Sequence, residues 1–144
     1  MSTQTGIQYG YGVITSKIKI TDIEKLKSLL LRLPDYKAEI NEYFKNENIT
    51  TPTISDYLDY MEGDYGIAEI LEKIIYKEEG LELCSCNDCE GNNYLLYPAT
   101  YPWYLSKLDF SMTEDKLKAI FEKYIRLLTD ESINITYQSC ENYA

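Results

Sequence analysis

Three cysteines lie close together in the middle of the chain, and a fourth lies far from them. Cys84, Cys86 and Cys89 form the pattern Cys-x-Cys-x-x-Cys, and Cys140 stands alone. The Cys-x-x-Cys spacing lets a tight turn present two thiolates to one tetrahedral zinc ion. Because the chain contains no histidine, the simplest closed site uses four cysteines. We therefore predict one structural Zn²⁺ ion bound by Cys84, Cys86, Cys89 and Cys140.

Other interpretations of these cysteines stay open. Unpaired cysteines can serve as small buried hydrophobic side chains, although Asn87, Asp88 and Glu90 make this segment polar. A disulfide is less favoured, because residues 1–6 show no secretion signal and cysteine clusters in reducing compartments more often bind metal or do redox chemistry. If Cys140 is not a ligand, then Asp88, Glu90, water or another chain would complete the metal site.

Several kinds of catalytic chemistry are missing from the sequence. Without histidine, neither a Ser-His-Asp triad nor a Cys-His pair can form. The glycines near the N-terminus do not form a dinucleotide fingerprint, and no phosphate-binding Gly-Lys-Ser/Thr loop is present. A thioredoxin-like motif opens a helix, whereas Cys86 and Cys89 precede Gly91 and another apparent strand. We do not expect an enzyme, and a small thiol redox protein is kept as an alternative.

The chain is acidic, and its charge is uneven. It has 144 residues and a net charge of −10, which argues against a protein that binds nucleic acid by neutralising phosphates. Residues 54–90 contain eleven acidic and two basic side chains. Such a run is often a solvated helix face, and the alternative is an acidic surface that attracts a basic partner. The candidate partner-binding residues are Asp56, Asp59, Glu62, Asp64, Glu69 and Glu72.

Hydrophobic periodicity and capping motifs predict one strand followed by several helices. The strand covers residues 9–20. Capping boxes that begin at Thr21 and Ser111 open helices over residues 21–33 and 111–128. Further helices are expected over residues 35–46 and 64–78, with a short helix that begins near Thr53 or Ser55 and ends at Gly63.

After Gly80 the hydrophobic period changes to two. Residues 81–97 read as a β-hairpin with Gly91 in its turn, and residues 133–140 read as a final strand. Cys84 and Cys86 then lie on the face opposite Leu81 and Leu83, and Cys140 lies on the non-core face of its own strand. Residues 100–103 form an aromatic loop that covers the core or lines a ligand pocket.

Together these elements predict one α+β domain over residues 1–144. It contains a largely antiparallel sheet of about four strands, several helices and a zinc-knuckle hairpin at residues 81–97.

Two segments carry a resemblance to a known family. Residues 94–103 (YLLYPATYPW) and 135–142 (ITYQSCEN) resemble small acidic proteins encoded by Firmicutes and their phages or mobile elements. With the cysteine pattern added, the chain resembles type II-A anti-CRISPR metalloproteins, which are phage-borne inhibitors of the guide-RNA nuclease Cas9.

This resemblance implies a function. The chain would be a non-enzymatic inhibitor, stabilised by structural zinc, that binds Cas9 carrying its guide RNA through an acidic surface and blocks target-DNA loading. We expect a monomer in the cytoplasm of the bacterial host, with no direct nucleic-acid binding and no membrane contact. The alternative is a zinc-stabilised adaptor that binds another host protein.

Overall fold

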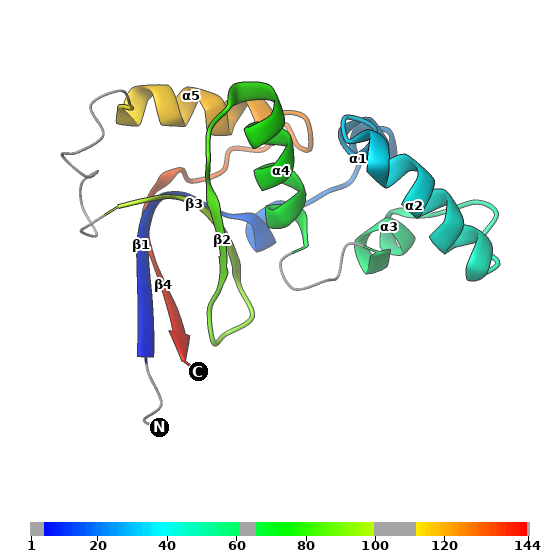
Figure 1. Ribbon diagram of the computed structural model, residues 1–144, viewed down its shortest axis with the longest axis horizontal. Helices are drawn as coiled ribbons and strands as arrows, with labels where there is room; N and C mark the ends of the chain where they lie inside the picture. The colour runs from blue at the N-terminus through cyan, green and yellow to red at the C-terminus, as the bar shows by residue number, and fades with distance from the viewer. Residues whose placement is uncertain (1–4, 61–65, 100–111, 144) are drawn as a thin grey trace.

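The structure is a computed structural model that describes residues 5–60, 66–99 and 112–143. Within these ranges the fold is α+β, with five α-helices and a four-stranded antiparallel sheet (Figure 1), which confirms the predicted fold class. The strands are β1 (Thr5–Ile14), β2 (Cys84–Asn87), β3 (Asn93–Pro98) and β4 (Thr136–Tyr143). The helices are α1 (Ile23–Leu30), α2 (Pro34–Asn46), α3 (Ile54–Tyr60), α4 (Ile67–Glu79) and α5 (Glu114–Ile125).

The strands follow the order β2-β3-β1-β4 across the sheet. The first strand is therefore central, since β1 pairs with β3 on one side and with β4 on the other. Gly12 of β1 lies opposite Leu96 of β3 and opposite Thr136 of β4. The hairpin of β2 and β3 forms one side of the sheet, and β4 forms the other edge.

Two glycines allow the backbones of β1 and β3 to approach closely. A Cβ atom added at Gly12 would lie 2.1 Å from the carbonyl oxygen of Leu95. At Gly10 the added Cβ would lie 2.6 Å from the Cβ of Leu96. Real Cβ atoms do not come this near to other heavy atoms, so any other residue would force the two strands apart.

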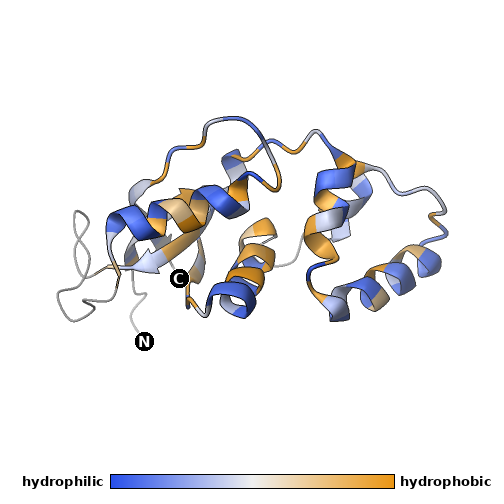
Figure 2. Cartoon of the chain, turned by 90° about the horizontal axis from the view of Figure 1, so that it is seen from above, coloured by the Kyte–Doolittle hydropathy of each residue, from blue (hydrophilic) through white to orange (hydrophobic). Residues whose placement is uncertain are grey.

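One continuous hydrophobic cluster joins the sheet to the helices. Helices α4 and α5 lie over one face of the sheet, and α1, α2 and α3 extend to one side (Figure 1). Each of these helices carries hydrophobic residues along one side and hydrophilic residues along the other (Figure 2). Buried members of the cluster are Val13, Leu95, Ile74, Phe121, Tyr124, Leu26, Leu29, Phe44 and Tyr57.

The predicted helices are present, but their ends differ in detail. Helix α1 is capped by Asp22 instead of Thr21, because the Asp22 carboxylate accepts the N–H of Glu24 at 2.9 Å. Pro34 is the first residue of α2, a position where the missing N–H costs nothing. Thr113 caps α5 by accepting the N–H of Lys116 at 3.2 Å, and the predicted cap Ser111 lies outside the described residues.

Other boundaries are also informative. Helix α4 ends at Gly80, which adopts a φ of 68° in the left-handed region, as the sequence predicts. Strand β1 covers residues 5–14 instead of 9–20, because a short 3₁₀ helix (Thr15–Lys17) follows it. The final strand begins at Thr136. The predicted helix end at Gly63 and the aromatic loop 100–103 lie outside the described residues.

None of the helices in the described ranges is long and apolar enough to cross a membrane.

The glycine contacts generate a testable prediction. Replacing Gly12 with alanine should lower the free energy of unfolding by about 1–3 kcal/mol or more, because the new methyl group would overlap the Leu95 carbonyl. Urea denaturation measures this change.

Gly91→Ala is the matched control. Gly91 has a φ of 85° but no atom within 4 Å of an added Cβ, so that substitution should cost only the left-handed strain of about 1–2 kcal/mol. A Gly12→Ala protein as stable as the parent would contradict the close approach of β1 and β3.

Candidate functional site

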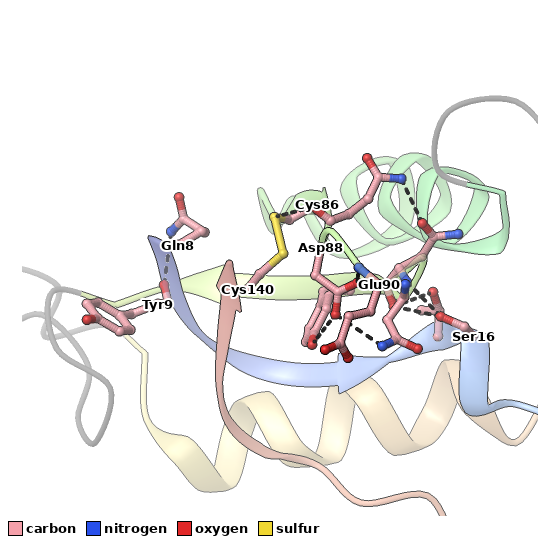
Figure 3. Close-up of a disulfide and its surroundings, with 12 residues drawn as sticks. Gln8, Tyr9, Ser16, Cys86, Asp88, Glu90 and Cys140 are labelled. Carbon is pink, nitrogen blue, oxygen red and sulfur yellow. Dashed lines mark hydrogen bonds between the residues drawn. A yellow bond between two sulfur atoms is a disulfide. The ribbon is translucent and has the colours of Figure 1, made fainter. Parts of the chain in front are cut away.

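The cysteines come together although they start on opposite edges of the sheet. Cys86 belongs to β2 and Cys140 to β4, and two strands separate these edges. A flat sheet would hold such edges about 14 Å apart. Their Cα atoms are nevertheless only 6.6 Å apart, and a disulfide joins the two side chains (Figure 3). The sheet is therefore strongly coiled, so that the hairpin folds over toward β4.

A backbone hydrogen bond ties the hairpin turn to the same strand. The N–H of Cys89 donates to the carbonyl of Glu141 at 3.2 Å. Glu141 follows Cys140 directly in the sequence, so the turn lies beside the disulfide.

The disulfide sits in a small hydrophobic core of its own. Tyr94, Leu96 and Cys140 are buried there, and Cys140 is 0% exposed. Cys84 and Cys86 pack against them. This core is separate from the main core, which contains Leu81 and Leu83, and this confirms the predicted facing of Cys84, Cys86 and Cys140. They meet because the sheet coils, since β4 pairs with β1 and not with the hairpin itself.

The disulfide changes the interpretation of the predicted metal site. The β-hairpin is present, but a zinc knuckle at its tip is not supported, because sulfur atoms in a disulfide have no thiolate to offer a metal ion. Cys84 and Cys89 are free. Among the described residues, no group of three metal-ligating side chains is placed to hold an ion. Zinc binding by Cys84, Cys86, Cys89 and Cys140 therefore stays a prediction, and it applies to the reduced chain.

The disulfide closes a large loop. Its two cysteines are 54 residues apart in the sequence, and the chain-entropy model gives such a crosslink about 4 kcal/mol of stabilisation. Sequence alone could not identify this pair, because no local pattern reports which distant strand comes to lie beside Cys86.

The free thiol of Cys84, which packs against the same core, is a weak nucleophile. Burial raises the pKa of Cys84, and the negative charge of Glu72 raises it further. Because the thiolate is the reactive form, Cys84 stays protonated at neutral pH and attacks the neighbouring disulfide slowly.

Glu72 itself lies in a half-buried position at the edge of this region. Burial raises the pKa of its carboxyl group, and the nearby charge of Glu69 adds to the effect. The nearby backbone of Ser85 and the charge of Lys73 oppose it. Glu72 therefore connects the acidic helix α4 to the cysteine-bearing strand β2.

The other predicted partner-binding residues have different surroundings. Asp56 accepts the N–H of Thr53 at 2.8 Å, so it caps the start of α3. Asp59 is exposed on the same helix. Glu69 forms an ion pair with Lys73 at 3.1 Å. Glu62 and Asp64 lie outside the described residues.

Basic residues from distant parts of the chain neutralise two further acids of the 54–90 run. Arg32 contacts Glu78 at 2.6 Å, and Lys123 contacts Glu79 at 3.0 Å. The acidic run is therefore less negative on the folded surface than in the sequence.

A shallow hollow remains open beside α4. It has a volume of about 330 Å³ and is lined by Glu72, Lys73, Tyr76, Glu82 and Leu83. Tyr76 is 60% exposed, which is unusual for a large aromatic side chain. Neither Tyr76 nor Glu82 is among the binding residues predicted from the sequence. Tyr76 could have been found, because it falls outside the apolar stripe of its helix.

One carboxylate organises the hairpin turn. Asp88 accepts hydrogen bonds from the backbone N–H groups of Glu90 and Asn92 at 2.9 and 2.8 Å. It also accepts from the Asn92 side chain at 3.1 Å and from the Tyr94 hydroxyl at 3.0 Å (Figure 3). Desolvation alone would raise the pKa of Asp88, but these hydrogen bonds outweigh it and lower the pKa.

Removing this carboxylate should therefore weaken the hairpin. We expect Asp88→Ala to lower the free energy of unfolding by roughly 1–3 kcal/mol at neutral pH, since it leaves several donors without an acceptor. Thermal or urea unfolding measures the loss, and Glu90→Ala, which removes an exposed neighbouring carboxylate, is the control.

The loss should also depend on pH. The pKa of Asp88 is lower in the folded chain, so its contribution is complete above the unfolded value of about 3.9 and disappears as the pH falls through the folded value. Equal stability of the Asp88→Ala and parent proteins at pH 7 would refute this role.

Comparisons with known proteins add no family to this description. No protein-family model matches the chain, and no curated protein or solved structure matches it.

Proposed function

We propose that the chain is a non-enzymatic inhibitor of CRISPR-Cas9 that acts in the cytoplasm of the bacterial host. It binds the nuclease, loaded with guide RNA, through an acidic surface and blocks entry of target DNA. The name Cas9 comes from the resemblance of residues 94–103 and 135–142 and of the cysteine pattern. The observation that carries a binding function is the hollow beside α4, whose lining combines an exposed aromatic side chain with two carboxylates.

The composition of this hollow suits a protein partner. Exposed tyrosines that can be covered by a partner often dominate binding energy, and Tyr76 is the most exposed large hydrophobic side chain of the described residues. Glu72 and Glu82 lie on the same hollow. Lys73 is already paired with Glu69, so the net character of the hollow is negative.

A negative hollow fits a basic nucleic-acid-binding surface. Cas9 holds its RNA-DNA duplex in a positively charged channel. A folded acidic surface that occupies part of this channel competes with incoming DNA, whereas a guide RNA that is already bound keeps its own contacts. Charge complementarity of this kind raises the association rate and is screened over about 8 Å at physiological ionic strength.

The absence of histidine from the chain supports a binding role instead of catalysis. General acid–base catalysis near neutral pH most often uses histidine.

A binding experiment tests the proposal. Purified chain should capture Cas9 loaded with guide RNA, and the complex should fail to bind target DNA. Tyr76→Ala should weaken capture by tenfold or more, as expected of an interface centre. Glu72→Gln combined with Glu82→Gln should weaken it several-fold, and rising salt should reduce the difference between this double variant and the parent.

Control variants separate position from charge. Glu42 and Glu47 are exposed on and just after α2, so Glu42→Gln combined with Glu47→Gln removes the same charge elsewhere and should leave capture unchanged. Equal loss in both double variants would show that only net charge matters. No capture of Cas9 at all would remove the nuclease from the proposal, and capture of a different host protein would favour the adaptor.

The disulfide favours one further candidate, a small thiol redox protein. A redox role predicts that the chain accelerates thiol–disulfide exchange in a model substrate. Cys140 is completely buried, so an attacking thiol can reach only the half-buried Cys86, and the slow exchange that this implies speaks against a redox role.

A further inference from the structure

Three cysteines of the coiled sheet share one place in the molecule. The Cα atoms of Cys86 and Cys140 are 6.6 Å apart. Cys84 stands two residues earlier than Cys86 in the same strand. In an extended chain, Cα atoms two residues apart are separated by about 6.5 Å. All three side chains belong to the small core formed with Tyr94 and Leu96. Sulfur atoms from both edges of the sheet thus meet inside one apolar pocket.

The backbone separation suits a metal ion as well as a disulfide. Bridged cysteines have Cα atoms about 4.4–6.8 Å apart, so the observed 6.6 Å lies near the upper limit. In a tetrahedral thiolate site the zinc–sulfur distance is about 2.3 Å, which places sulfur atoms about 3.8 Å apart. Rotation of the two side chains could open the sulfurs to this distance with little movement of the strands.

Cys89, the fourth cysteine, belongs to the hairpin turn beside this cluster. It is exposed and free, and its N–H group is bound to the carbonyl of Glu141 beside Cys140. Asp88 is a poor competitor for the fourth position, because its carboxylate already accepts the four hydrogen bonds of the turn.

We propose that the four cysteines form a redox-gated site for a thiophilic divalent cation such as Zn²⁺. In the oxidised chain the Cys86–Cys140 disulfide excludes the ion. A dithiol reductant donates two electrons and two protons to this disulfide and becomes a disulfide itself, leaving four protein thiols. These thiols bind one Zn²⁺ and release four protons. The hairpin is thereby crosslinked to β4 in both states, by a covalent bond in one and by a metal ion in the other.

Metal titration of the two redox forms tests this proposal. The oxidised chain is first identified by counting two free thiols, those of Cys84 and Cys89. The reduced chain, prepared with a phosphine that is then removed, should bind about one Zn²⁺ by elemental analysis. Co²⁺ in its place should show the charge-transfer absorption of a metal thiolate. The oxidised chain should bind neither ion.

Two single substitutions locate the ligands. Cys84→Ser and Cys89→Ser retain Cys86 and Cys140, so the oxidised fold stays crosslinked. After reduction each should bind Zn²⁺ more weakly by a factor on the order of 100, at least the loss seen when a supporting residue of a metal site is removed. Ser85→Ala, on the opposite face of β2, should bind like the parent.

Three results would overturn the proposal. They are a reduced chain that binds no metal, an oxidised chain that binds as much as the reduced one, and Cys84→Ser or Cys89→Ser proteins that bind with the affinity of the parent.

Discussion

The close contact between β1 and β3 is the constraint on which the structure depends. At Gly12 the two backbones come so near that no side chain fits between them, and glycines in strands permit the tight bends that coil a sheet. Helices α4 and α5 cover one face of this sheet. On the other face the coil brings the two outer strands together around the disulfide. Both the main core and the cysteine cluster thus follow from one region of β1.

Local patterns predicted the elements and their faces well. The period of two in β2 and β4 placed Cys84, Cys86 and Cys140 on the correct side of the sheet, and the stripe of α4 up to Gly80 was also correct. The first helix cap was misplaced by one residue, because Thr21 and Asp22 can both accept a backbone N–H. The choice depends on where the chain first turns helical.

The parts that sequence could not predict are those set by distant contacts. The order of strands in a sheet depends on which strands become neighbours. A hydrophobic period of two shows only which side chains of a strand face the core. The same limit applies to the cysteines, because spacing along the chain describes Cys86 and Cys89 but says nothing about Cys140. The negative charge of residues 54–90 was overestimated for the same reason. Arg32 and Lys123 lie far from this run in the sequence, but they form ion pairs with Glu78 and Glu79 in the folded chain.

The pairing of β1 with β4 has a consequence for how the chain folds. Ile7 lies opposite Glu141, so this half of the sheet joins segments separated by almost the whole sequence. Contacts between such distant segments form only after a large loss of chain entropy, and they slow folding. The helices and the β2–β3 hairpin need only local closure. Docking of β4 onto β1 is therefore the costliest closure on the folding pathway, and until it happens one edge of β1 stays open to pairing with another molecule.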